Sequence, residues 1–427
     1  MKLSGVFENR NGVFYIDGVS SLELAEKYGT PLYVLSEKRI RENYRRLYKA
    51  LSLNSKKFRI YYSAKANTNL SVLKILKDEG AYIDTVSPGE VFLALKAGFS
   101  PEKILFTGTS VKDEELNFLV KLNIPVNVDS LSQLKRLLKI TTPEFLSFRV
   151  NPQVRAGHHQ HCITAGKDSK FGFWENEVID GYKIALKAGV KKFGIHMHIG
   201  SGILKVKPFV LAVKKLLTII KRVYKETGIT FNLINIGGGL GIPYKPGEKE
   251  LNLNLFSSKV FGFLSRMVEK YGLGEPILCI EPGRYIVGDA GILLTRVNTV
   301  KSNPYRKFVG VDAGFNMLIR PVMYNSYHHI VVANKLNYPA KEIYDIVGPL
   351  CESGDFLARG RKLPKIEEGD LLAVMDAGAY GYVMSSQYNS RPRGAEVLVM
   401  DGKHELIREA ETLESLLLGQ KIASWLT

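Results

Sequence analysis

The chain has 427 residues, more than one ordinary hydrophobic core accommodates, and this length predicts two domains. Hydrophobic residues make up 45% and charged residues 24%, which is typical of globular proteins and excludes a disordered chain. The formal net charge is +17, but the lysines are spread singly or in pairs along predicted helix faces, without a basic arm. We therefore expect a surface that attracts anionic metabolites, and no nucleic-acid partner.

The longest apolar stretches contain lysines and are too short to cross a bilayer, and the first residues have no signal-peptide core. The three cysteines, Cys162, Cys279 and Cys351, are odd in number and far apart, so they predict neither a disulfide framework nor a zinc site. These features predict a cytoplasmic protein without a membrane partner.

The first 36 residues predict two short strands, over 13–18 and 31–35, on either side of a helix over 21–29. Ser20 is the expected N-cap of this helix and Gly29 its C-cap. A second helix is predicted from Ser36 to Leu51.

Between residues 58 and 281, apolar and β-branched runs alternate with stretches of helical periodicity. The predicted strands are Phe58–Ala64, Ala81–Val86, Ile104–Thr107, Pro125–Val128, Leu146–Val150, Phe193–His198, Phe231–Ile236 and Ile277–Ile280. The predicted helices are Leu70–Glu79, Gly89–Ala97, Lys112–Leu122, Ser130–Lys139, Glu177–Ala188, Phe209–Glu226 and Phe256–Tyr271, and glycines follow several of them. Parallel strands with right-handed crossovers are expected, and eight such units predict a (β/α)8 barrel over residues 37–287.

The helical period disappears after about residue 288. Strands are predicted over Ile292–Val300, Phe308–Val311, His329–Val332, Ile343–Val347, Leu371–Met375 and Ala395–Met400, and Asp401-Gly402 predicts a hairpin into one more strand. We expect residues 288–427 to form a β-rich, sandwich- or barrel-like domain that residues 1–36 join.

Lys65 stands where the first predicted barrel strand ends, in the segment Tyr62-Ser-Ala-Lys65-Ala-Asn67. The chemistry of such barrels takes place at the carboxyl ends of their strands. A lysine at this place is poorly positioned for packing but well positioned to form a Schiff base with a carbonyl compound.

Glycine-containing turns close the sixth, seventh and eighth predicted strands. They are His198-Ile-Gly-Ser201-Gly202, Gly237-Gly238-Gly239-Leu-Gly241 and Glu281-Pro282-Gly283-Arg284. Many glycine runs simply form tight turns and have no function. Consecutive glycines also let backbone N–H groups converge on an anion. Three glycine-containing turns at neighbouring strand ends of one barrel therefore favour a phosphate site. Together with Lys65, this site predicts pyridoxal phosphate as the carbonyl compound.

Glu281 follows the eighth strand beside this predicted phosphate site. A carboxylate facing a pyridine nitrogen keeps that nitrogen protonated, although a helix cap or a surface salt bridge would also explain an isolated glutamate. His198 is placed to stack on the cofactor ring, and His196 shares its face of the strand. A histidine at a strand end is more often structural, but the neighbouring Gly-Ser turn favours a functional role.

At this level of detail the chain resembles the diaminopimelate decarboxylases, barrel-type pyridoxal phosphate enzymes of the alanine-racemase-like fold type III. The resemblance spans essentially the whole chain. The matching segments are Tyr62–Asn67, His196–Ser201, Gly237–Gly241, Glu281–Arg284, Asp312–Asn316, Arg320–Tyr324, Cys351–Asp355, Asp376–Gly381 and Tyr388–Arg393.

The resemblance implies a role for each matching position. Lys65, Cys351 and His198 would be catalytic, with Lys65 carrying the Schiff base and Cys351 acting as the acid. The residues implied to hold the cofactor are Lys65, His198, Ser201, Gly238, Gly239, Glu281, Pro282, Gly283, Arg284 and Tyr380. The residues implied to bind substrate are Arg284, Arg320 and Tyr324 at a carboxylate, Glu352 at the distal ammonium, and Tyr380.

The implied reaction is decarboxylation of meso-2,6-diaminopimelate to L-lysine and carbon dioxide. The resemblance also implies a homodimer with shared active sites, because Cys351 and Glu352 of such enzymes reach the partner subunit's site. Fixed charges for the non-reacting end would reject substrates that lack a second carboxylate. The alternatives are a related decarboxylase acting on ornithine, arginine or carboxynorspermidine, and a non-catalytic cofactor-binding barrel, against which the second domain argues.

The segment between the fifth strand and the next helix departs from the family pattern. It keeps the Gly-x-x-x-Lys-Phe-Gly ending at 166–172, but Ala165 stands where a threonine is common. His158, His159 and His161 precede it without helical spacing and without an adjacent carboxylate. We expect an active-site loop here and no metal.

Overall fold

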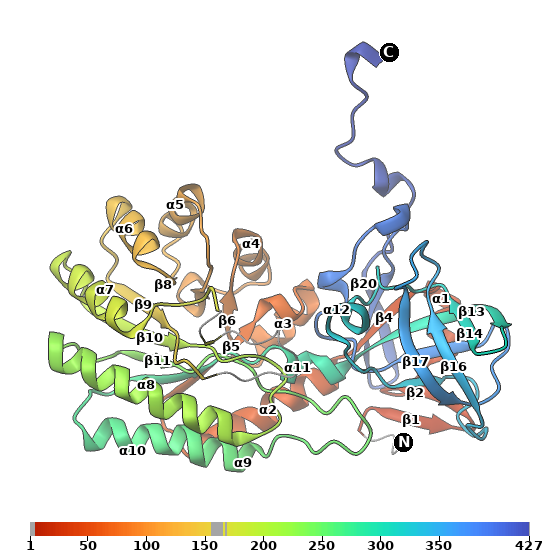
Figure 1. Ribbon diagram of the computed structural model, residues 1–427, viewed down its shortest axis with the longest axis horizontal. Coiled ribbons are helices and arrows are strands. Elements are labelled where there is room, and N and C mark those ends of the chain that lie inside the picture. The colour runs from red at the N-terminus through yellow and green to blue at the C-terminus, as the bar shows by residue number, and fades with distance from the viewer. Residues whose placement is uncertain (1–4, 155–164, 167–168, 427) are drawn as a thin grey trace. The chain divides into compact units, whose positions relative to one another are not determined.

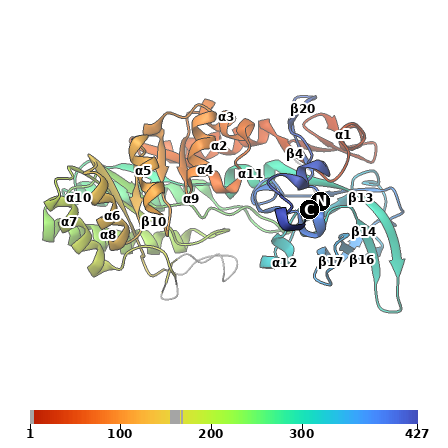
Figure 2. The same cartoon turned by 90° about the horizontal axis from the view of Figure 1, so that it is seen from above.

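The computed structural model describes residues 5–154, 165–166 and 169–426, which divide into two compact units (Figures 1 and 2). The barrel unit comprises Ile40–Pro243 and Gly247–Val287. The β-rich unit comprises the described parts of Met1–Arg39 and Gly288–Thr427, together with Tyr244–Pro246.

The barrel unit is built on eight parallel strands. They are β5 (Phe58–Ser63), β6 (Tyr82–Thr85), β7 (Ile104–Phe106), β8 (Asn127–Val128), β9 (Phe145–Val150), β10 (Lys192–Met197), β11 (Leu233–Asn235) and β12 (Ile277–Ile280). Their spatial order is β7-β6-β5-β12-β11-β10-β9-β8, and a parallel bridge between Phe106 and Val126 joins the two ends. The predicted (β/α)8 barrel and all eight of its strands are confirmed, with no strand end shifted by more than two residues.

Helices separate the strands and lie outside them (Figure 1). They are α2 (Glu37–Ser52), α3 (Leu70–Asp78), α4 (Pro88–Lys96), α5 (Asp113–Lys121), α6 (Leu131–Ile140), α7 (Glu175–Lys187), α8 (Val206–Thr227), α9 (Leu253–Phe256), α10 (Phe263–Lys270) and α11 (Arg284–Val287), and a π-helical segment (Ser257–Gly262) joins α9 to α10. Ser87 and Ser130 cap α4 and α6 by accepting backbone N–H groups. No helix among the described residues is long and apolar enough to span a membrane.

The predicted turns after the helices are confirmed by their backbone angles. Gly80, Gly98, Gly189, Gly228 and Gly272 all have positive φ, between 59° and 95°. Only glycine adopts this conformation without strain, and it lets each helix end and the chain return to the barrel.

The inside of the barrel changes from apolar at one end to polar at the other. Tyr61, Leu105, Leu233 and Cys279 form a buried apolar cluster at inward positions. The strand ends that follow carry buried polar residues instead: Ser63, Asp84, Arg149, His196, Asn235 and Glu281. Since burying a polar group without a partner is unfavourable, this layer marks the end of the barrel that carries chemistry.

The β-rich unit contains a nine-stranded sheet and a three-stranded sheet. Its strands are β1 (Phe7–Arg10), β2 (Val13–Ile16), β3 (Val19–Ser20), β4 (Leu32–Ser36), β13 (Gly291–Ser302), β14 (Lys307–Val311), β15 (Ile330–Val332), β16 (Glu342–Val347), β17 (Phe356–Leu363), β18 (Leu371–Val374), β19 (Ala395–Met400) and β20 (Lys403–Arg408). The helices are α1 (Ser21–Tyr28) and α12 (Arg320–Tyr324). The predicted β-rich fold is confirmed, and β4 joins it by pairing with both β13 and β19.

Several features of this unit differ from the sequence prediction or refine it. Strands β1, β3 and β17 were not predicted, whereas the hairpin at Asp401-Gly402 joins β19 to β20 as expected. The Ser20 hydroxyl caps α1 by accepting the N–H of Leu22.

The predicted active-site loop after β9 is only partly described. The three histidines at positions 158, 159 and 161, and Cys162, lie outside the described residues.

Candidate active site

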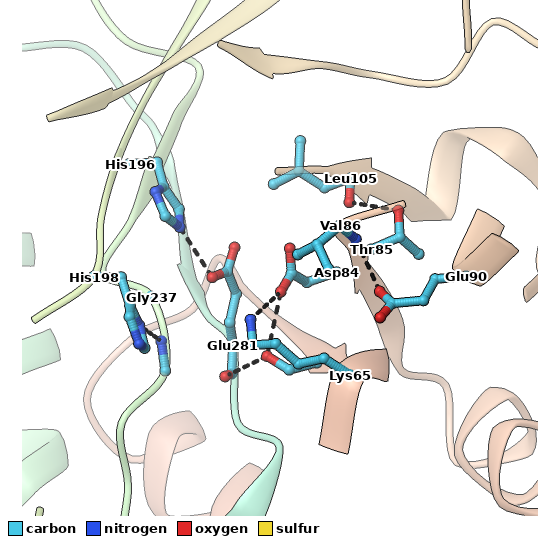
Figure 3. Close-up of polar contacts among 12 residues, drawn as sticks. Lys65, Asp84, Thr85, Val86, Glu90, Leu105, His196, His198, Gly237 and Glu281 are labelled. Atoms are coloured by element: carbon cyan, nitrogen blue, oxygen red, sulfur yellow. Dashed lines mark hydrogen bonds and ion pairs between the residues drawn. The ribbon is translucent and has the colours of Figure 1, made fainter. Parts of the chain in front are cut away.

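Lys65 lies in a single 3-10 turn, Ala64–Ala66, directly after β5 (Figure 3). The turn packs closely on the loop after β12: the Ser63 N–H donates to the Pro282 carbonyl at 3.1 Å. A Cβ at Gly283 would lie 2.9 Å from Cβ of Ala66, so only glycine permits this approach. The local fold therefore fixes Lys65 beside the residues that follow β12.

Asp84 of β6 is the ion-pair partner of Lys65. Its Oδ2 lies 3.2 Å from Lys65 Nζ, and it also accepts a hydrogen bond from Ser63 Oγ at 3.3 Å. Burial and the nearby Glu281 carboxylate raise the pKa of Asp84, against the lowering effect of Lys65. A lysine held at a strand end by one buried carboxylate is positioned for covalent chemistry.

Both carboxylate oxygens of Glu281 are held by donors from neighbouring strands, and Figure 3 shows the contact with His196. Oε2 lies 2.9 Å from Nε2 of His196, and Oε1 accepts a hydrogen bond from Nδ2 of Asn235 at 2.7 Å. Burial alone would raise the pKa of Glu281, but His196 and then Lys65 outweigh it, and the pKa falls to about 2. Glu281 is thus a buried anion, able to hold a cationic N–H opposite it.

His198 is held in its neutral form by the turn after β11. The Gly238 N–H donates to His198 Nδ1 at 3.0 Å, so this nitrogen is an acceptor and carries no proton. Burial lowers the pKa of His198 well below its usual value, and the charges of Lys65 and Arg149 lower it further. A neutral imidazole in a fixed orientation suits a stacking contact with a flat ring.

The glycine turns after β10, β11 and β12 lie against one another. Backbone bonds run from Ile203 N–H to the Gly239 carbonyl at 2.9 Å and from Glu281 N–H to the Gly237 carbonyl at 2.9 Å. A Cβ at Gly238 would overlap the Glu281 carbonyl oxygen, and Gly237 and Gly239 have φ values of 69° and 106°. Side chains at these positions would collide with backbone carbonyl oxygens of the neighbouring turns, so glycine is required for the three turns to pack together. Consecutive glycines in tight turns of this kind are typical of phosphate sites.

Arg284 and Ser201 come together beside these turns. Both Nε and Nη2 of Arg284 lie near Ser201 Oγ, at 3.4 and 3.2 Å, and Arg284 is buried at the start of α11. Arg149 of β9, which the sequence did not single out, is also buried, and its guanidinium stacks 4.4 Å from the ring centre of Phe171. This end of the barrel therefore carries several cationic groups suited to an anionic ligand.

Arg320 and Tyr324 begin and end the single-turn helix α12 in the β-rich unit. Arg320 is 1% exposed, and its Nη1 lies 2.9 Å from the Tyr244 hydroxyl and 3.0 Å from His328 Nε2. Tyr324 is half-buried and lies one turn further on the same helix. The four-residue spacing therefore places both side chains on one helical face.

Cys351 and Glu352 lie on the exposed loop between β16 and β17. Asp355 holds this loop in shape, because its carboxylate accepts the N–H groups of Phe315 at 2.7 Å and Leu350 at 2.8 Å. The Cys351 N–H donates to Asn389 Oδ1 at 2.8 Å. Both side chains are presented to solvent from a loop that is fixed at its base.

Tyr380 follows β18 in the left-handed backbone region, with φ of 58°. Such a conformation is uncommon for tyrosine and often marks a functional turn. Arg320, Tyr324, Cys351, Glu352 and Tyr380 thus belong to the β-rich unit, whereas the other predicted site residues gather at one end of the barrel.

Sequence reasoning missed Asp84, Arg149 and Asn235, and it noted His196 only as a neighbour of His198. Each is a polar residue at an inward position of a largely apolar strand, and this position was the signal that the sequence offered. Among the described residues, no group of three or more His, Cys, Asp or Glu side chains could hold a metal ion.

Glu90, at the start of α4, is a further acid near Lys65. Its Oε2 accepts the Val86 N–H at 2.8 Å (Figure 3), and burial raises its pKa to about 7. Because a raised pKa means that the fold prefers the neutral form, stability from this group is present below about pH 4.5 and is lost as pH rises through 7. We expect Glu90→Gln to stabilise the protein by about 2–3 kcal/mol at pH 8 and much less near pH 4.5.

Urea denaturation of the parent and the variant at both pH values measures this difference. The matched control is Glu114→Gln, because Glu114 is an exposed acid at the start of α5. This substitution should change the free energy of unfolding by the same small amount at both pH values. If Glu90→Gln increased the free energy of unfolding equally at both pH values, the Glu90 carboxyl group would not have the raised pKa described above.

Comparisons with known proteins identify the family to which this site belongs. Residues 37–288 match the family model described as "Pyridoxal-dependent decarboxylase, pyridoxal binding domain". A diaminopimelate decarboxylase of Methanothermobacter thermautotrophicus is 56% identical over 417 residues, covering 97% of each chain. This chain belongs to the diaminopimelate decarboxylase family of pyridoxal-dependent decarboxylases.

Other members of the diaminopimelate decarboxylase family support the same assignment. A relative from Archaeoglobus fulgidus is 43% identical, over 99% of this chain and all of its own. The crystal structure of the M. jannaschii diaminopimelate decarboxylase in complex with L-lysine is 36% identical, with a TM-score of 0.91 and full coverage of both chains. The family and fold type expected from the sequence are thereby confirmed, and pyridoxal phosphate is the cofactor of the family.

Proposed function

We propose that this chain decarboxylates meso-2,6-diaminopimelate at its D-configured centre, giving L-lysine and carbon dioxide, the last step of lysine biosynthesis. The observation that carries the proposal is Lys65 at a barrel strand end, 3.2 Å from Asp84 and close to the buried anion Glu281. The long, full-length matches to diaminopimelate decarboxylases give this arrangement its reaction class.

The site fits pyridoxal phosphate. Lys65 would hold the cofactor covalently, and the turns containing Ser201, Gly239 and Gly283 would surround its phosphate. Bound pyridoxal phosphate supplies an electron sink for the pair of electrons left when carbon dioxide departs. The contact between the Gly238 N–H and His198 indicates that Gly238 also orients the imidazole.

Glu281 and His198 would set the protonation state of the cofactor ring and its orientation. As an anion buried among donors, Glu281 would hold a proton on the pyridine nitrogen, which strengthens electron withdrawal. His198 is neutral, so it would cover the ring face without adding a charge. The way in which the barrel fixes these two side chains supports both roles.

The substrate carries a second amino acid end that does not react, and fixed charges would select it. Arg284 and Arg320, with Tyr324, would bind its carboxylate, and Glu352 would bind its ammonium group. Tyr380 would contact both cofactor and substrate. A substrate without the second carboxylate would offer these two arginines no negative charge, which disfavours ornithine.

Cys351 would deliver the proton to the carbon that loses its carboxylate. Cys351 and Glu352 are exposed in the single chain, which supports their use by a partner subunit in a homodimer. The C-terminal residues add support, because six large apolar side chains are more than half exposed on a projecting segment (Figure 1): Leu413, Leu417, Leu418, Ile422, Trp425 and Leu426. The cytoplasmic location expected from the sequence stays a prediction.

Carbon dioxide release from the pyridoxal phosphate-loaded protein tests the proposal. The substrates, offered separately, are meso-diaminopimelate, ornithine, arginine and carboxynorspermidine. Release from meso-diaminopimelate alone, with L-lysine as product, is the expected result. Release from another substrate would contradict the assignment of the distal carboxylate site, and no release from any would contradict the reaction.

Arg320→Lys is expected to raise KM for meso-diaminopimelate about tenfold to a hundredfold with a smaller change in kcat. Lysine keeps the charge but cannot make the paired, planar hydrogen bonds of a guanidinium to a carboxylate. Steady-state decarboxylation kinetics measure the effect.

The control for Arg320→Lys is Met323→Leu, an exposed position on the same helix α12. It should leave both constants unchanged. A fall in kcat with unchanged KM for Arg320→Lys would argue that this arginine does not bind the substrate.

A further inference from the structure

His196 and the residues beside it on β8 and β9 form a buried polar group whose atoms are incompletely satisfied. The atoms without a hydrogen-bond partner among the described residues are Nδ1 of His196, Oγ of Ser147, and both Nδ2 and Oδ1 of Asn127. All three side chains are at most 1% exposed. Buried polar atoms in native proteins nearly always have a partner, and water supplies it where protein does not.

These three side chains face the inside of the barrel on successive strands. Asn127 of β8 is the direct cross-strand neighbour of Ser147 of β9, and Ser147 is the neighbour of Gly194 of β10. His196 is two residues beyond Gly194 and therefore on the same face. Phe148, next to Ser147, points the other way and packs on Tyr182 of α7, at 4.2 Å between ring centres.

The glycine at position 194 lets the Ser147 side chain lie directly against β10. A Cβ at Gly194 would lie 2.8 Å from both Cβ and Oγ of Ser147 and 2.9 Å from the end of the Phe145 ring, closer than real side chains approach. The Ser147 hydroxyl is therefore held inside the barrel, where its oxygen has no hydrogen-bond partner among the described residues. A cluster of buried donors and acceptors without protein partners is the kind of interior site that holds water.

The hydrogen bonds around Glu281 define which nitrogen of His196 carries a proton. Asn235 Oδ1 accepts the Gly237 N–H at 2.9 Å, so its Nδ2 is the group that donates to Glu281. Glu281 is ionised and can only accept, which requires a proton on Nε2 of His196. In the neutral ring the remaining nitrogen, Nδ1, is then an acceptor, and the described residues provide no donor for it.

We propose that a water-binding site bounded by Asn127, Ser147 and His196 lies inside the barrel, and that His196 is a positioning residue for Glu281. Water bound there donates to His196 Nδ1 and fixes the tautomer that donates Nε2–H to Glu281. Glu281 is thereby kept ionised and oriented, and so holds the proton on the pyridine nitrogen of the cofactor. The role toward the cofactor rests on the proposed function, whereas the water site does not.

The test uses the protein loaded with pyridoxal phosphate labelled with ¹⁵N in the ring. For His196→Leu we expect the ¹⁵N resonance to move toward the unprotonated pyridine value at pH 7.5, because Glu281 loses a donor. The cofactor dissociation constant should rise and kcat should fall, each about tenfold to a hundredfold, with little change in KM. Ser147→Ala, which removes one partner of the water without touching Glu281, should shift the resonance in the same direction by a smaller amount.

Two further variants separate positioning from packing. His196→Gln keeps a terminal N–H donor at a similar reach and should restore most of the ¹⁵N shift and of kcat. Met197→Leu, a buried and outward-facing neighbour on β10, is the control and should change none of these values.

Three results would overturn the proposal. One is a ¹⁵N resonance in His196→Leu that is unchanged from the parent while thermal stability falls, which would make His196 a packing residue. Another is an equal loss of kcat and an equal ¹⁵N shift in the His196→Gln and His196→Leu variants. The third is a high-resolution crystal structure without water within hydrogen-bond distance of His196 Nδ1. Since the resonance, the dissociation constant and the water are observed without turnover, they stay informative if the substrate assignment fails.

Discussion

Lys65→Ala is expected to abolish the absorbance of the Schiff base between the cofactor and the protein and to lower carbon dioxide release by several orders of magnitude. Lys65 lies in the turn after β5, held by Asp84 and closely packed by Gly283 against the loop that carries Glu281. Alanine fits this turn but has no amine to bond with a carbonyl compound. The variant should therefore fold like the parent while losing the covalent contact with the cofactor.

Absorbance spectra with and without borohydride reduction, followed by mass spectrometry of the intact protein, measure this loss. The parent should gain the mass of the reduced cofactor on Lys65, and Lys65→Ala should gain none. Lys74→Ala, an exposed lysine on α3 that pairs with Asp78, is the matched control and should behave like the parent. A reduced adduct persisting in Lys65→Ala would assign the covalent link to a different lysine.

The barrel could be predicted from sequence because its strands are short apolar runs, each followed by an amphipathic helix and many of these by a glycine. The prediction was weakest at β8, which has two residues instead of the four expected. Pro125 has no N–H to donate, and Val126 is joined to Phe106 of β7 by an isolated bridge. The predicted strand, Pro125–Val128, was therefore longer than the strand that forms regular hydrogen bonds.

Strand β17 was missed because its sequence, Phe-Leu-Ala-Arg-Gly-Arg-Lys-Leu, lacks an apolar run. It is the last strand at one edge of its sheet, and its residues Arg359, Gly360 and Lys362 are exposed to solvent. Gly360 has φ of 60°, and the pairing with β16 is irregular on both sides of Ile346. Such a strand forms because β16 offers it a partner, which a local pattern does not reveal.

The candidate site could be predicted where motifs are continuous in sequence, as at Lys65 and the glycine turns. The residues that support it could not, because Asp84, Asn235 and His196 meet Glu281 or Lys65 only through the register of the parallel strands. Tyr244 is a similar case, since its contact with Arg320 joins residues 76 positions apart. A single polar residue in an apolar strand indicates a site only when its neighbours across the sheet are known.

Cys351→Ala is expected to slow decarboxylation about a hundredfold to ten-thousandfold while leaving cofactor absorbance unchanged. Cys351 is exposed on a loop fixed by Asp355, so the substitution removes a proton donor without disturbing a core. Reactions run in D₂O should give lysine deuterated at one face of its ε-carbon with the parent, and at both faces with the variant. Cys351→Ser, similar in size but a poorer acid, should be slow as well; a fast Cys351→Ser would argue against acid catalysis.

Mixing the two variants tests whether Cys351 acts in the site of a partner subunit. If each site combines Lys65 of one chain with Cys351 of the other, a mixed dimer of Lys65→Ala and Cys351→Ala chains contains one fully native site. Random exchange of subunits should then restore about a quarter of the parent activity, because half of the dimers are mixed and each has one working site of two. Sites built within single chains would stay defective after mixing, and activity at the level of the separate variants would contradict the shared-site homodimer.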